Sequence, residues 1–140
     1  MDILLNLIGK FHPLIIHLPI GFILIGLLIE INSKKFESPN KILKFIFLWS
    51  SITCLISVLT RFLQYQSEGL LWESIQGHFI SGIITLLLSV AFYFYLNKSK
   101  PFIAIPRKLY TVGICVNLLI TGHLGGNITH GEDHLIEPLP

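Results

Sequence analysis

Histidine is the residue type in this chain that is best suited to chemistry, and all six copies are expected at one end of the molecule. Neutral imidazole nitrogen binds haem iron and several metal ions. The order of apolar segments along the chain puts every histidine on the same side of a membrane. A cluster of imidazoles at one membrane face is a candidate site for haem or a metal. The six are His12, His17, His78, His123, His130 and His134.

Four long apolar segments must position these histidines. The chain has 140 residues, of which 52% are hydrophobic and 13% charged, against roughly 25% charged in an ordinary soluble domain. Each segment has about the 17–25 residues that cross a bilayer as a helix. The sequence therefore predicts one all-α domain, an up-down bundle of four transmembrane helices followed by a tail at 125–140. The predicted spans are about 13–31, 42–63, 78–96 and 106–124.

Basic residues indicate the orientation of this bundle. Four spans put both termini on one side, and the two loops on the other side carry eight of the ten Lys and Arg residues. An excess of positive charge marks the cytoplasmic face. Both termini and the histidines are therefore expected on the periplasmic or extracellular side. The eight are Lys34, Lys35, Lys41, Lys44, Lys98, Lys100, Arg107 and Lys108.

Helices 1 and 3 share a pattern in which a glycine lies one turn deeper than a histidine. His17 is followed by Gly21, and His78 by Gly82. A glycine beneath a histidine leaves room for a flat macrocycle, although close helix packing is the alternative explanation. Pro19 predicts a kink in helix 1. We expect His17 and His78 to be the first axial pair of a haem, with His12 in a supporting position or at a second site.

Polar stripes run along the middle helices and should face the bundle interior. Arg61 ends the stripe of helix 2 near the histidine side. It could bind a haem propionate or another anion through bidentate hydrogen bonds. Alternatively, it extends to the lipid headgroups or pairs with Glu68 or Glu73. On helix 4, Asn117 is expected to connect helices. The stripes are Ser50, Cys54, Ser57 and Arg61 on helix 2, and His78, Gly82, Thr85 and Ser89 on helix 3.

The end of helix 4 and the tail offer further candidate ligands. His123 closes helix 4 and is the main substitute for either axial histidine. A glycine-rich segment follows, in which tight turns are expected. Four tail residues could bind a divalent metal, although no established zinc or calcium spacing is met. The alternative for the tail is a hydrogen-bonded cap over the bundle. The four are His130, Glu132, Asp133 and His134.

These residues favour a b-type haem held by two histidines. Two axial imidazoles leave no open coordination position, which favours electron transfer by an electron carrier or subunit over catalysis by a stand-alone enzyme. Another metal such as copper and a cofactor-free polar network remain alternatives. No C-x-x-C-H motif for covalent haem attachment, nucleophile–base pair or phosphate loop is present. Basic residues are not arranged for nucleic acid.

On these residues the chain resembles an uncharacterised family of four-helix bacterial membrane proteins that begin with an H-P-x-x-x-H-x-P element. Within that family it is most similar to the subgroup found ahead of a periplasmic cytochrome c-type domain. The resemblance implies a multi-pass protein of the bacterial inner membrane with its histidines on the periplasmic side. It also implies proximity to electron transfer, with a periplasmic cytochrome c-type protein as partner, while a larger respiratory-type membrane complex is the alternative partner. The matching residues are His12-Pro13, His17, Pro19, His78, Gly82, Thr121-Gly-His-Leu-Gly-Gly and Thr129-His-Gly-Glu-Asp133.

The resemblance leaves three functions open. The first is haem-based electron transfer, and the second is a cofactor-free membrane anchor or small subunit of a larger complex. The third is a metal-handling protein that uses the tail residues.

Overall fold

Helices make up almost all of the part of the chain that the structure describes. The computed structural model describes residues 2–97 and 105–131, and it contains no strand within those ranges. A short 3-10 turn, η1, separates the third and fourth helices. The helices are α1 (Asp2–Lys10), α2 (His12–Ile15), α3 (His17–Ile31), α4 (Pro39–Glu68), α5 (Trp72–Asn97) and α6 (Arg107–His130), and η1 spans Ser33–Lys35.

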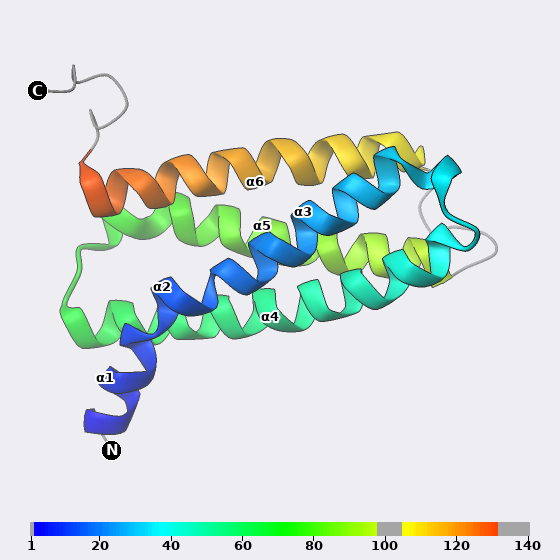
Figure 1. Ribbon diagram of the computed structural model, residues 1–140. Helices are drawn as coiled ribbons and strands as arrows, with labels where there is room; N and C mark the ends of the chain where they lie inside the picture. Colours follow the sequence, from blue (N-terminus) through cyan, green and yellow to red (C-terminus); the bar gives the residue numbers. More distant parts are fainter. Residues whose placement is uncertain (1, 98–104, 132–140) are drawn as a thin grey trace, which may run out of the picture.

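The long helices run alternately up and down as an elongated bundle (Figure 1). α4 packs against α3 and α5, α5 packs against α6, and α3 meets α6 to close the bundle. α1, the turn between α4 and α5 and the last residues of α6 lie at one end, which we call the histidine end (Figure 1). The opposite end holds η1 and the start of α6, and we call it the basic end. The all-helical architecture with four long helices agrees with the sequence.

Four helical stretches have the length and apolar composition needed to cross a membrane. They are His12–Ile31, Pro39–Glu68, Trp72–Asn97 and Arg107–Thr129. The helices extend beyond the predicted spans at the histidine end, because α4 continues to Glu68 and α5 already begins at Trp72. Gly69 ends α4 in the left-handed conformation, with φ of 61°, as glycine commonly does after a helix. The turns expected at Gly125 and Gly126 are wrong, since α6 stays helical to His130, whereas Gly131 ends the helix with a positive φ of 92°.

Proline bends the first span where the sequence predicts a kink. The helix is interrupted at Ile16, between α2 and α3. Pro19 has no N–H for the carbonyl of Ile15, four residues earlier, so the regular hydrogen-bond ladder breaks there. The next bond, from Ile20 N–H to the Ile16 carbonyl, is long at 3.4 Å. The short N-terminal helix α1, which packs on α4, was not anticipated.

The two halves of the bundle interior differ in chemistry. Toward the basic end, an apolar core forms around Phe47 and Phe92, whose rings meet edge to face at 4.7 Å between centroids. Ile23, Leu43 and Ile114 are fully buried beside them. Toward the histidine end, the buried side chains are mostly polar, and both predicted stripes face the interior. This second set contains His12, Ser57, Thr60, Arg61, His78, Ser81, Thr85, Asn117 and Thr121.

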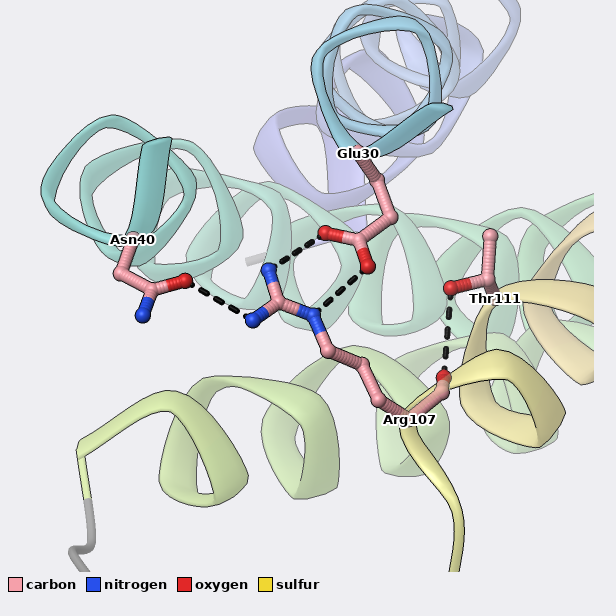
Figure 2. A network of polar contacts seen from close by, with 4 residues as sticks. All are labelled: Glu30, Asn40, Arg107 and Thr111. Atoms are coloured by element: carbon pink, nitrogen blue, oxygen red, sulfur yellow. Dashed lines mark hydrogen bonds and ion pairs between the residues drawn. The ribbon is translucent and has the colours of Figure 1, made fainter. Parts of the chain in front are cut away.

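An ion pair fastens the basic end of the bundle (Figure 2). Arg107, at the start of α6, donates from Nε and Nη2 to the two carboxylate oxygens of Glu30 on α3, each at 2.6 Å. Its Nη1 donates to Oδ1 of Asn40 on α4 at 2.9 Å. One guanidinium therefore links three helices, and all of its nitrogens have a partner.

Candidate functional site

A cavity of about 600 Å³ opens between the helices at the histidine end. Its volume falls within the range of about 300–1,000 Å³ that is usual for small-molecule and cofactor sites. Residues of α2 through α6 line it, so every long helix contributes a wall. Most of the wall is apolar, with Ile16, Ile20 and Leu118 among its members, while His12, Arg61 and His78 are its buried basic side chains.

His12 is held in place by α4. It is only 6% exposed, and its Nδ1 lies 3.0 Å from the carbonyl oxygen of Ser57 and 3.2 Å from Oγ1 of Thr60. A ring nitrogen that faces a carbonyl oxygen must donate, so the proton sits on Nδ1 in the neutral ring. The lone pair is then on Nε2, which is the state in which histidine binds metals.

His78 is held in the same way by α6. It is 7% exposed, and its Nδ1 lies 3.0 Å from the carbonyl oxygen of Thr121. The same carbonyl argument assigns the proton to Nδ1 and the lone pair to Nε2. Such a backbone carbonyl behind a histidine is typical of metal-binding imidazoles, because it fixes the tautomer and the ring orientation.

The rings of the two buried histidines, which belong to different helices, lie next to one another inside the bundle. Their ring centroids are 6.2 Å apart and the ring planes are 79° to each other. A metal held between two imidazoles at about 2.0–2.1 Å from each nitrogen would separate the ring centroids by about 6 Å. At this spacing His12 and His78 could together hold one metal atom.

Glycine on α6 makes room for the His78 ring. A Cβ placed on Gly125 would lie 2.9 Å from Cε1 and 3.1 Å from Nδ1 of His78. Any larger residue would thus push the ring away from the Thr121 carbonyl. Gly82 and Gly122 also line the cavity, and an added Cβ on either would meet nothing closer than 4.0 Å. Gly125 therefore allows close contact with the His78 ring, whereas Gly82 and Gly122 leave free space along the cavity wall.

A polar network on α5 and α6 stiffens this wall. The side-chain amide of Asn117 donates to the carbonyl of Ser81 at 3.0 Å and to Oγ1 of Thr85 at 2.7 Å. Oγ1 of Thr121, whose carbonyl holds His78, donates to the carbonyl of Asn117 at 2.8 Å. Asn117 thus connects two helices, as the sequence predicts.

Arg61 lines the cavity from α4 and is 6% exposed. Its Nη1 donates to Oε1 of Gln64 at 2.8 Å, and Nε2 of Gln64 donates in turn to the Glu68 carboxylate at 3.1 and 3.2 Å. Nε and Nη2 of Arg61 are buried without any hydrogen-bond partner. Arg61 is therefore buried inside the bundle and does not extend from its surface. Within the described residues, the only ion pair is that of Arg107, so Arg61 pairs with neither Glu68 nor Glu73.

The structure brings some of the expected residues together and separates others. His12, His17, His78, Arg61 and Gly82 all line the cavity. His17 is exposed, however, and the residue across from His78 is His12. His123 and Gly21 do not line the cavity, and His123 is exposed. The side chain of His130 and the residues Glu132, Asp133 and His134 lie outside the part of the chain that the structure describes.

Helical phase explains this difference. The buried positions of the first span recur at helical spacing along one face, and they are His12, Pro19, Ile23, Gly26 and Leu27. His17 lies five residues after His12, which is about 140° around a helix, so the two side chains lie on different faces and only His12 is buried, while His17 borders the cavity from an exposed position. The burial of His12 could be predicted from the sequence, because His12 lies on the same helical face as the buried residues that follow it.

No protein-family model, curated protein or solved structure matches this chain. The geometry of the site is therefore the basis for any functional conclusion. Within the described residues, no three His, Cys, Asp or Glu side chains are grouped in a way that could hold a metal ion. A metal bound by protein ligands alone usually needs at least three of them. The pair of facing histidines is suited instead to a cofactor that brings most of its own metal ligands.

Proposed function

We propose that this protein spans a bacterial inner membrane four times and binds a b-type haem between His12 and His78, through which it transfers electrons. The first support is the bundle surface. Large apolar side chains are exposed on every long helix, for example Leu24, Leu55, Leu87 and Leu119. A water-soluble bundle would carry polar residues on these outward faces. A lipid environment is the solvent in which this surface is stable.

The distribution of charge supports an orientation for the bundle. Lys34 and Lys35 in η1, Lys41 and Lys44 early in α4, and Arg107 and Lys108 at the start of α6 all belong to the basic end. Positive charge accumulates on the cytoplasmic side of membrane proteins. We therefore propose that the basic end is cytoplasmic and that the histidine end faces the periplasm.

The observation that carries the haem proposal is the pair of facing imidazoles, each with Nδ1 tied to a backbone carbonyl. The porphyrin supplies four of the six iron ligands, so the protein needs to provide only two. The cavity adds apolar walls on helices α3 to α6 and open glycine surfaces at Gly82 and Gly122. Haem with two axial histidines exchanges electrons and has no open position for oxygen.

The residues of the chain have separate tasks in this proposal. His12 and His78 hold the iron, and the carbonyls of Ser57 and Thr121 keep each ring in the binding tautomer and orientation. Apolar wall residues such as Ile20 exclude water. The electron partner that the sequence resemblance suggests is a periplasmic cytochrome c-type protein, which would dock at the histidine end.

Alanine variants of three histidines test this proposal. The measurement is the reduced-minus-oxidised visible spectrum of the protein purified in detergent. The wild type should show the sharp α-band of a six-coordinate haem, and both His12→Ala and His78→Ala should lose it. His17→Ala is the matched control, since His17 lines the same cavity but is exposed. If His17→Ala loses the band and His12→Ala keeps it, the axial position belongs to His17. A flat spectrum in folded, haem-supplied wild type would refute the proposal.

A cofactor-free membrane anchor or small subunit is the second candidate. The observation that favours it is that His12, His78 and Asn117 all hydrogen-bond to a neighbouring helix, so each of them also serves packing. This function predicts co-purification with a larger complex and no bound iron. In that case His12→Ala and His78→Ala should weaken the fold without any spectral change.

A metal-handling role through His130, Glu132, Asp133 and His134 is a third proposal, tested by metal analysis of the full chain and of a variant in which all four residues are replaced by alanine.

A further inference from the structure

Two arginines of this bundle have the same arrangement of donors but different partners. In Arg107, Nη1 donates to a side-chain amide oxygen at 2.9 Å, and Nε with Nη2 grips the Glu30 carboxylate (Figure 2). In Arg61, Nη1 likewise donates to a side-chain amide oxygen, that of Gln64, at 2.8 Å. The Nε and Nη2 edge of Arg61 has no partner. The two sites therefore differ in that Arg107 binds a carboxylate through Nε and Nη2 and Arg61 does not.

This difference matters because of where Arg61 lies. A buried guanidinium is costly unless its donors are paired. Arg61 is more deeply buried than Arg107, whose side chain is 30% exposed. It also lines the cavity, whereas Arg107 lies at the far end of the bundle. Its carboxylate partner is therefore expected to come from a molecule in the cavity.

We infer that the cavity takes a largely apolar ligand that bears a carboxylate, and that Nε and Nη2 of Arg61 bind this carboxylate side-on. Neighbouring groups cover both nitrogens, so binding includes a small rotation of the guanidinium toward the cavity. The amide oxygen of Gln64 accepts the hydrogen bond from Nη1, and Nε and Nη2 on the other side of the guanidinium have no partner. Glu68 lies behind Gln64 and does not compete for that edge.

The inference rests on the proposed function for the identity of the ligand, since haem is an apolar macrocycle with two propionate carboxylates. One propionate would then lie on Arg61, near the histidine end, while the ring lies between the buried histidines. A free long-chain carboxylic acid from the membrane has the same two features. The chemistry shared by both sources is a carboxylate attached to an apolar body.

Paired ligands that differ only in the carboxylate test the inference. The probes are haem and haem dimethyl ester, in which both carboxylates are blocked, titrated into detergent-purified protein and followed by absorbance. Wild type should bind haem about 10- to 100-fold more tightly than the ester, which is the usual effect of charge-assisted hydrogen bonds. Arg61→Met should remove this preference while leaving the histidine ligands intact. Arg61→Lys should keep part of it, because lysine has the charge but not the planar fork.

The outcomes separate the two ideas. Equal preference for haem in wild type and Arg61→Met would overturn the role of Arg61 and leave the haem proposal standing. If wild type binds neither haem form, the haem proposal fails, and oleate compared with methyl oleate decides the inference alone. A preference for oleate that Arg61→Met removes would support a free carboxylic acid as ligand. The absence of any preference would overturn the inference.

Thermal unfolding of protein prepared without added ligand provides a second measurement. Replacing an unpaired buried charge with an apolar side chain of similar length is commonly neutral or stabilising. Arg61→Met should therefore unfold at the same temperature as wild type or higher. A clear decrease, together with an unchanged ligand preference, would assign Arg61 to the fold and overturn the inference.

Discussion

Gly125→Ala is the smallest change that should separate the site from the fold. The new Cβ would lie 2.9 Å from Cε1 and 3.1 Å from Nδ1 of His78. Ordinary contacts of this kind are 3.4–4 Å, so the ring must move by several tenths of an ångström. The 3.0 Å bond between His78 Nδ1 and the Thr121 carbonyl limits that movement. We expect the bond to be lost or distorted.

The effect of Gly125→Ala on stability should be small because two terms oppose each other. Loss of the hydrogen bond costs about 0.5–1.5 kcal/mol. Alanine in place of glycine inside a helix contributes about 0.8–1.0 kcal/mol in the opposite direction. The His78 ring borders the cavity and can shift into it, unlike a ring in the filled apolar core, so the net change in unfolding free energy should be within about 1 kcal/mol of zero. Haem ligation depends on the ring orientation, so affinity should fall at least about tenfold, as is typical when a support behind a metal ligand is disturbed.

The assay combines thermal unfolding with an absorbance titration of haem. Gly113→Ala is the matched control on the same helix, since its Cβ would meet nothing within 4 Å and Gly113 does not line the cavity. The control should bind haem like wild type. If Gly125→Ala and Gly113→Ala bind haem equally well, the reasoning that places an axial ligand at His78 is refuted.

Two further predictions concern the basic end and the helix contacts. Arg107→Met should lower the free energy of unfolding by about 1–2 kcal/mol, because it leaves the part-buried Glu30 carboxylate unpaired, and it should leave the haem spectrum unchanged. An unfolding midpoint equal to wild type would contradict a stabilising ion pair. Gly26→Ala should cost about 1–3 kcal/mol, since its Cβ would lie 2.8 Å from Cε2 of Phe47. Gly21→Ala is its control, with nothing within 4 Å of the added Cβ, and equal stability of the two variants would refute this estimate.

The bundle could be predicted from the sequence because long apolar segments have few alternatives. Length and composition alone define the four spans, and Pro19 locates the interruption of the first. The helix α1 was missed, since Asp2–Lys10 is too short to span a membrane and precedes the first apolar run. The helical course of α6 through Gly125 was missed as well. Its glycines suggested turns, but packing against α5 overrides their low helix propensity.

The sequence predicts several of the residues that line the cavity, but not which histidine lies next to His78. His78 and Arg61 were expected to face the interior, and both are buried in the cavity wall. Gly21, one turn below His17, favours His17 as the partner of His78. Helical phase favours His12 instead, and the structure places His12 there. The carbonyls of Ser57 and Thr121 could not be anticipated. Backbone groups carry no sequence signal, and their position depends on how α4 and α6 pack.

The contrast between the two ends of the bundle argues that the histidine end is specialised for a ligand. At the basic end, apolar side chains fill the interior, and all nitrogens of the Arg107 guanidinium have a partner. At the histidine end, the same four helices enclose a cavity, and Arg61 keeps two donors unpaired. Sequences usually satisfy the rules of packing and polar pairing together, and departures from those rules tend to lie at functional sites. The departure here involves a cavity, two neighbouring buried imidazoles and two unpaired guanidinium donors, which are the features on which the haem proposal rests.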